Sequence, residues 1–152
     1  MTYNQKRHIK LFKYSEYFNN LGKSFYKESK IEYLEFLGHE AAIKSYIFWR
    51  SRKLFCLLME KFVNRIISGE EFSDSFLGLL QRLKYERDGF LKELISEKLK
   101  DFQVDPRSYR FSRFISFIRC ECDNFMEDYQ NEEFYDSIKD CFLKLQKALN
   151  EE

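Results

Sequence analysis

Residues 62–80 read FVNRIISGEEFSDSFLGLL, and this stretch decides the fold because a short polar break separates two apolar segments. Ser68 is a residue type that caps helix N-termini, and Glu71 stands three positions later, which is the capping-box pattern. Ile67 before the cap and Phe72 after it fit a hydrophobic staple. The stretch therefore predicts that one helix ends and the next begins almost at once, so that the two fold back as a hairpin.

The apolar pattern on both sides of this hairpin is helical. Apolar residues recur three and four positions apart, which places them on one face of a helix. The chain has one proline and 5 glycines, and valine and threonine are rare, which favours long helices with short joints over a sheet. We predict an all-α fold, an antiparallel bundle of about five helices formed by residues 14–37, 41–67, 69–99, 108–129 and 131–149.

Single residues set the expected helix boundaries. Gly22 is expected to bend or split the first segment, and Gly38 to end it before a new helix starts. Gly89 is expected to weaken the third helix by about 1 kcal/mol relative to alanine, and to bend or break it. Asp105 precedes Pro106, and a residue before proline disfavours helix, so a boundary is expected there.

The length and composition favour one soluble globular domain. The chain has 152 residues, of which 44% are hydrophobic and 34% charged, enough for a core and a solvated surface. We predict a single helical bundle domain over residues 14–150, preceded by a basic N-terminal arm of residues 1–13. No run approaches the roughly 20 uncharged apolar residues of a membrane span, and the basic N-terminus lacks the apolar run of a secretory signal, so no membrane insertion is expected.

The cysteines and the residue usage bear on the compartment. All four cysteines lie among apolar helix residues, which favours buried, reduced thiols and an intracellular, reducing compartment. Phe, Tyr, Lys, Ile and Asn are abundant whereas Ala, Gly and Pro are rare, a bias typical of AT-rich codons. A plastid stroma or a bacterial cytoplasm is therefore expected. The cysteines are Cys56, Cys120, Cys122 and Cys141.

The net charge of +1 conceals an uneven distribution. Residues 1–67 carry 13 Lys and Arg against 6 Asp and Glu, whereas residues 68–152 carry 13 against 19. The basic half holds two groups that are either solvated or contact RNA phosphates or an acidic partner. They comprise Lys6, Arg7, Lys10 and Lys13 in the predicted arm, and Arg50, Arg52 and Lys53 further along.

Carboxylates are densest in residues 121–140, and Lys139 is the only basic residue in that segment. This segment is either a solvated acidic face without a specific partner, or a docking surface that attracts a basic protein over long range. The eight carboxylates are Glu121, Asp123, Glu127, Asp128, Glu132, Glu133, Asp136 and Asp140.

No catalytic or cofactor-binding pattern is recognisable. A di-iron bundle needs Glu-x-x-His pairs on two helices, whereas Glu35 and His39 are four residues apart without a second pair. Cys120 and Cys122 point roughly 200° apart on a helix and cannot share one metal ion. Glycine-rich phosphate loops are absent, and neither His8 nor His39 has a nucleophile beside it. We expect a protein that is not an enzyme and holds neither metal nor cofactor.

Residues 62–80 resemble the helix hairpin of bacterial self-protective colicin-like immunity proteins. Ile67, Ser68, Glu71, Phe72 and Phe76 match the family's apolar helix end, serine, Glu-Phe pair and later phenylalanine. Further on, FISFIRCECDNFMEDY followed by EEFYDSIKDCFLKLQKAL is similar to the family's acidic turn and final helix. The resemblance implies a small helical bundle that presents acidic residues to a toxic nuclease domain and blocks its basic substrate site.

A second resemblance covers the whole chain. Residues 14–49, YSEYFNNLGKSFYKESKIEYLEFLGHEAAIKSYIFW, are similar to uncharacterised small proteins encoded in algal plastid genomes, which implies a compartment and no activity. Two functions therefore stand open. One is a non-catalytic, immunity-like module that binds a basic protein through residues 121–140. The other is a small accessory or structural subunit of a plastid assembly that contacts RNA through the basic arm.

Overall fold

The computed structural model describes residues 2–96, 98–99, 102–125 and 131–151. Within them the chain forms seven helices and no strand, which confirms the predicted all-α bundle, although the helices outnumber the expected five or so. In chain order these are α1 (Gln5–Asn20), α2 (Phe25–Glu28), α3 (Lys30–Arg50), α4 (Arg52–Val63), α5 (Gly69–Ile95), α6 (Arg107–Asp123) and α7 (Asn131–Asn150).

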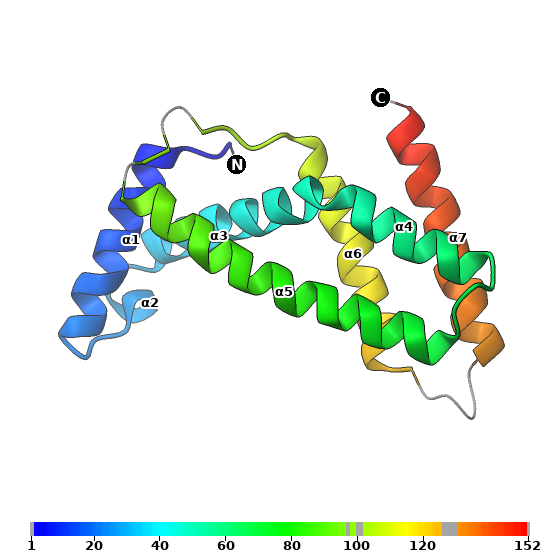
Figure 1. Cartoon of the computed structure of the whole chain (residues 1–152). Helices are drawn as coiled ribbons and strands as arrows, with labels where there is room; N and C mark the ends of the chain where they lie inside the picture. The colour runs from blue at the N-terminus through cyan, green and yellow to red at the C-terminus, as the bar shows by residue number, and fades with distance from the viewer. Residues whose placement is uncertain (1, 97, 100–101, 126–130, 152) are drawn as a thin grey trace.

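The helices form an elongated bundle (Figure 1). α3 continues into α4 with only a change of direction, and α5 folds back beside both of them. α6 packs mainly on α3, and α7 packs on α4 and α6. The pair α1 and α2 lies at one end of the molecule and α7 at the other.

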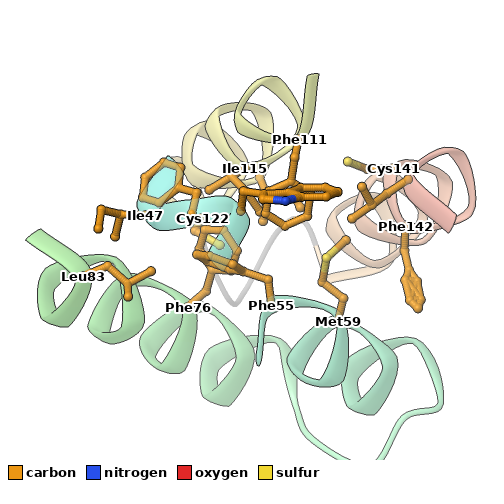
Figure 2. Packing of buried hydrophobic residues seen from close by; sticks show 14 of the residues in the cluster. Ile47, Phe55, Met59, Phe76, Leu83, Phe111, Ile115, Cys122, Cys141 and Phe142 are labelled. Atoms are coloured by element: carbon orange, nitrogen blue, oxygen red, sulfur yellow. The ribbon is translucent and has the colours of Figure 1, made fainter. Parts of the chain in front are cut away.

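One continuous cluster of buried aromatic and aliphatic side chains fills the space between the helices. Figure 2 shows Phe55, Phe76 and Phe111, from α4, α5 and α6, turned toward one another, and all three are buried. At the hairpin, the rings of Phe62 and Phe72 stack with centroids 4.7 Å apart. Since burying one such side chain contributes about 1.5–3 kcal/mol, this cluster is the main source of stability.

The capping box at the start of α5 is confirmed. The Glu71 N–H donates to Ser68 Oγ at 3.1 Å, and the Ser68 N–H donates to the Glu71 carboxylate at 3.3 Å. α4 ends at Val63 and α5 begins at Gly69, so the predicted hairpin is present. Its turn consists of residues 64–68 and is longer than expected, because α4 ends before Ile67.

The two N-terminal glycines behave differently from each other. Gly22 ends α1 with φ +67°, and the Lys23 N–H donates to the Phe18 carbonyl at 2.9 Å, which is how a left-handed glycine closes a helix. The prediction that Gly38 ends a helix is wrong, because α3 runs through it. An interior glycine costs only about 1 kcal/mol, and the burial of residues such as Ile43 on the same helix outweighs that cost.

The expected helix over residues 41–67 is instead divided at Ser51. The Ser51 N–H donates to the Phe48 carbonyl, and the Ser51 carbonyl accepts from Leu54, so the hydrogen bonding passes from α3 to α4 without a loop. Ser51 is buried, and neither glycine nor proline marks the site. In contrast, α5 continues through Gly89 as far as Ile95 and is not broken there, although it ends before the predicted residue 99.

The segment predicted as a basic arm is part of a helix. Residues 5–13 form the first half of α1, in which His8, Ile9 and Leu11 are buried, and α1 packs on α3 and α5. The side-chain amide of Gln5 accepts from the Phe102 N–H at 3.2 Å and also donates to the Leu99 carbonyl. The boundary expected after residue 13 therefore falls inside α1.

The C-terminal helices begin where the sequence indicates. α6 follows Pro106 and α7 starts at Asn131. α6 ends at Asp123, short of the predicted residue 129, and residues 126–130 lie outside the described part of the chain. In the described residues, no helix has the length and apolar character that would let it cross a membrane.

Candidate functional site

Helix α7 has a buried apolar face and an exposed acidic face. Phe134, Ile138 and Leu145 are buried on the side that packs against α4 and α6. With the buried Cys141 these apolar positions recur three or four residues apart, so they share one helix face, and the carboxylates between them point to solvent. We name these exposed residues the α7 acidic stripe, which comprises Glu132, Glu133, Asp136 and Asp140.

The spacing of the stripe concentrates negative charge on one face. Glu132, Asp136 and Asp140 follow one another at four-residue intervals, and residues four apart are neighbours on a helix surface. Glu132 and Glu133 lie in the first turn of α7, where their charges also complement the positive end of the helix dipole. The stripe thus has a local role in helix stability in addition to its exposure.

Two cations contact the ends of the stripe. Arg65 Nη2 lies 3.5 Å from Glu132 Oε2, and both side chains are at least 60% exposed. Lys144 Nζ lies 2.9 Å from Asp140 Oδ2, also at the surface. Exposed ion pairs of this kind contribute about 0–1 kcal/mol. They therefore leave the carboxylates available to a stronger cationic partner.

Arg65 also fixes the turn that supports the stripe. Its φ of 58° lies in the left-handed region, which disfavours residues other than glycine. The guanidinium lies 3.8 Å from the centre of the Tyr135 ring, and the Tyr135 hydroxyl donates to the Val63 carbonyl at 2.7 Å. These contacts join the end of α4 to the start of α7. This role of Arg65 could not be predicted from the sequence, because glycine or asparagine is usual at such a position.

The other carboxylates of the predicted acidic surface are not part of the α7 acidic stripe. Glu121 on α6 is half-buried, and its charge helps to raise the pKa of the Cys141 thiol, which places it near α7. Asp123 lies 3.8 Å from Arg119 and lines a cavity between α3, α5 and α6. Glu127 and Asp128 lie outside the described residues. The structure therefore describes the predicted acidic surface mainly through α7.

The first basic group lies along α1. Lys6, Lys10 and Lys13 are exposed and spaced four and three residues apart, so they share one helix face. Arg7 differs, because its Nε and Nη2 donate to the two carboxylate oxygens of Glu35 at 2.8 and 2.9 Å. This bidentate pair joins α1 to α3. The three lysines are thus the part of the group that faces outward.

The second basic group lies at the junction of α3 and α4, away from α1 (Figure 1). Arg50 lies 3.3 Å from Glu86 and packs over the Tyr46 ring. Arg52 lies 4.4 Å from the centre of the Trp49 ring and donates to the Trp49 carbonyl at 3.0 Å. Lys53 is exposed. Both arginines therefore make contacts within the protein, and the two predicted basic groups do not merge into one surface.

Both histidines meet in a buried cluster that the sequence analysis missed. His8 Nε2 lies 2.6 Å from Glu40 Oε1, and His8 Nδ1 lies 2.9 Å from the Tyr3 hydroxyl. Since a carboxylate only accepts, His8 Nε2 donates to Glu40, and the Tyr3 hydroxyl is the hydrogen-bond partner of Nδ1. His39 stacks on His8 with centroids 5.6 Å apart.

This cluster attaches the first residues of the chain to α3. His8 and Tyr3 are almost fully buried, and burial raises the pKa of Tyr3, with a smaller contribution from the charge of Glu40. His39 Nδ1 donates to the Glu35 carbonyl at 2.8 Å, whereas its buried Nε2 has no hydrogen-bond partner. The contact between His8 and Glu40 spans 32 residues, so no local pattern could have indicated that the cluster joins α1 to α3.

The cysteines only partly match the expectation of buried thiols. Burial raises the pKa of Cys122 to about 12 and that of Cys141 to about 11, so both remain protonated and are poor nucleophiles. Cys56 is half-buried, but Cys120 is exposed, which corrects the expectation for that residue. It lies two positions from Cys122 and hence on the opposite side of α6. None of these four described cysteines forms a disulfide.

Comparisons with protein-family models, with curated proteins and with solved structures find no match to this chain. Within the described residues, no three His, Cys, Asp or Glu side chains are grouped so that they could hold a metal ion. The functional interpretation therefore rests on the surfaces described above.

Proposed function

We propose that this protein is a non-catalytic module that binds a basic protein partner through the α7 acidic stripe, in the manner of an immunity protein. One observation carries the proposal: four exposed carboxylates lie on the solvent side of a helix whose other side is buried in the core. Such a surface attracts a positively charged partner over long range and orients it during approach.

The distribution of charge over the molecule supports this direction of approach. The exposed lysines of α1 lie at one end and the α7 acidic stripe at the other (Figure 1). A basic partner is repelled by the first end and attracted by the second. The separation therefore favours docking at α7 over non-specific association elsewhere.

The contacts that hold the start of α7 in place favour a preorganised interface. Arg65 and Tyr135 join the α4–α5 turn to the first turns of α7. A surface that is already ordered loses less entropy when a partner binds. The turn belongs to residues 62–80, which carry the resemblance to immunity proteins, so that segment would hold the binding helix in place.

The experiment compares two variants of equal net charge. In the α7-neutral variant the stripe is replaced by amides: Glu132→Gln, Glu133→Gln, Asp136→Asn and Asp140→Asn. The matched control neutralises four exposed carboxylates elsewhere: Glu16→Gln, Glu28→Gln, Asp74→Asn and Glu93→Gln. Each protein is immobilised and used to capture partners from the native source, and the captured proteins are identified and quantified by mass spectrometry.

We expect the wild-type protein and the control to retain one basic protein that the α7-neutral variant loses. Capture should also fall with added salt, since exposed charges are screened beyond about 10 Å at 0.1 M. Equal capture by the two variants, an acidic partner, or no specific partner at all would contradict the proposal.

A second candidate function rests on the exposed face of α1. Lys6, Lys10 and Lys13 could contact successive RNA phosphates, as an accessory subunit of a plastid assembly would require. Each phosphate contact to a single strand contributes about 0.7 to the slope of log K against log salt. Replacing all three with glutamine should therefore reduce that slope by about 2 in anisotropy titrations with single-stranded RNA.

The matched control for the RNA test replaces three other exposed lysines, Lys61, Lys92 and Lys98, with glutamine. It has the same net charge but leaves α1 unchanged. If both triple variants lose the same affinity, the contact is non-specific and α1 has no RNA-binding role.

A further inference from the structure

A cavity of about 380 Å³ lies between α3, α5 and α6, a volume within the usual range for small-molecule sites. Its apolar wall includes Ile47 and Phe48 from α3, and Leu80 and Leu83 from α5. Figure 2 shows Ile47 and Leu83 close together at one edge of the core. The cavity is therefore a recess at the margin of the hydrophobic cluster, and it does not involve the α7 acidic stripe.

Cations from all three helices line the same cavity. Lys44 comes from α3, Lys84 and Arg87 from α5, and Arg119 from α6. The only carboxylate among the described lining residues is Asp123, which lies 3.8 Å from Arg119. Four cations face a single anion there, so the lining carries a clear excess of positive charge.

Gathering these cations at one cavity is unfavourable in itself. Burial lowers the pKa of Lys44, and the nearby charges of Arg119 and Arg87 lower it further. The Arg87 Nε is buried and has no hydrogen-bond partner in the structure, whereas its Nη2 lies 3.8 Å from Asp88 Oδ1. Like charges repel when they are gathered, and a buried donor without an acceptor is costly. An anion in the cavity would offset both costs.

The chemistry of the lining selects the kind of anion. Arginine matches the oxygens of a phosphate group through paired hydrogen bonds, and lysine binds phosphate as a point charge. A phosphate dianion suits several converging cations better than a singly charged carboxylate. The apolar wall formed by Phe48 and Leu83 would contact a hydrophobic body attached to that group.

We infer that the cavity between α3, α5 and α6 binds a small phosphate monoester, with its phosphate at Lys44, Arg87 and Arg119 and its apolar body against Phe48. Asp123 opposes the phosphate and limits the affinity. The binding site is separate from the proposed partner surface and stands independently of it.

Isothermal titration of the full chain with phenyl phosphate, inorganic phosphate and phenol tests the inference. We expect phenyl phosphate to bind at least tenfold more tightly than either of the other two, because only it engages both the cations and the apolar wall. Equal affinity for inorganic phosphate would overturn the apolar part of the site. Equal affinity for phenol, or no binding of phenyl phosphate, would overturn the site altogether.

Variants locate the binding within the chain. Arg87→Gln and Lys44→Met should each lower the affinity for phenyl phosphate about tenfold or more, since hydrogen bonds to charged groups are stronger than those between neutral groups. Asp123→Asn should raise this affinity severalfold, because it removes the negative charge that opposes the phosphate. Arg82→Gln on the same helix is the matched control, because Arg82 is exposed and lies outside the lining, and its affinity should stay within about twofold of wild type.

Circular dichroism checks that each variant is folded, and Lys84→Met at the exposed rim provides a substitution with little structural cost. The assignment to this cavity would be contradicted if the affinity for phenyl phosphate were unchanged in Arg87→Gln, Lys44→Met and Lys84→Met. It would also be contradicted if Arg82→Gln lowered the affinity as much as these three variants do.

Discussion

Tyr3, His8 and Glu40 form a chain of hydrogen bonds that joins the first residues of the protein to α3. The Tyr3 and His8 side chains are buried, and a buried polar group that loses its partner costs about 1–3 kcal/mol. The network therefore contributes to stability mainly because each member satisfies the next. It also explains why a segment that reads as a basic tail is part of the folded bundle.

We expect Tyr3→Phe to lower the free energy of unfolding by about 1–3 kcal/mol, because the ring stays while His8 Nδ1 loses its hydrogen-bond partner. Urea denaturation followed by circular dichroism measures this. Tyr85→Phe is the control, since Tyr85 is largely exposed, and it should change stability by less than about 0.5 kcal/mol. Equal stabilities of the two variants would show that the buried network does not stabilise the fold.

Residue-level features were predictable where their cause was local. Ser68 and Glu71 are three positions apart, and their reciprocal hydrogen bonds follow from that spacing. His8 and Glu40 meet across 32 residues, so only the packing of α1 on α3 brings them together. Arg65 adopts a left-handed backbone conformation that its side-chain contacts support, and no sequence rule indicates this.

At the level of the helices, single residues did not predict the helix ends correctly where packing between helices opposed them. Gly38 reads as a helix stop, yet α3 continues through it. Ser51 carries no strong signal, yet α3 ends there. The helix starts after Pro106 and at Asn131 lie where they were predicted, and the influence of Pro106 is confined to the residues next to it. Boundaries that depend on contacts between helices could not be read from the sequence.

The glycines of α5 test how the start and the interior of this helix are packed. Nothing lies within 4 Å of a β-carbon placed at Gly78 or Gly89, so alanine should stabilise each by about 0.5–1 kcal/mol. A β-carbon at Gly69 would lie 2.9 Å from the Phe125 ring, which packs on Phe134.

Gly69→Ala should therefore be at least about 1 kcal/mol less stable than Gly78→Ala, because overpacking costs about 1–3 kcal/mol. Thermal or urea unfolding of the three single variants gives the comparison. A stabilising Gly69→Ala would mean that the start of α5 does not pack against Phe125.

The contact between α1 and α3 predicts a dependence of stability on pH. Hydrogen bonds from Arg7 hold the pKa of Glu35 below its ordinary value of 4.5. The stabilisation is therefore fully present above that ordinary value and is lost as the pH falls through the lower pKa of the folded state. Glu35→Gln removes the titrating carboxylate and with it this part of the pH dependence.

We expect wild type to be more stable than Glu35→Gln at about pH 6, and the difference to shrink at about pH 3. Urea unfolding at the two pH values measures it. Glu28→Gln, at an exposed carboxylate, controls for the loss of one acidic group. A difference that stays constant with pH would argue against the Arg7–Glu35 contact.

At the scale of the whole molecule, the uneven charge of the chain becomes a separation in space. The lysines of α1 and the carboxylates of α7 lie at opposite ends because the N- and C-terminal helices do. The sequence was sufficient to predict the α7 acidic stripe, since its carboxylates are close together along one helix. It could not predict the cationic cavity, because Lys44, Arg87 and Arg119 come from three helices.

The association rate of the captured basic partner tests the role of the α7 acidic stripe most directly. It is measured by stopped flow for wild type, the α7-neutral variant and the matched control, at about 20 mM and about 500 mM salt. We predict that at low salt the α7-neutral variant associates at least about tenfold more slowly than the control, and that the gap narrows at high salt. Equal rates for the two variants at low salt would contradict the proposal that the partner docks on α7.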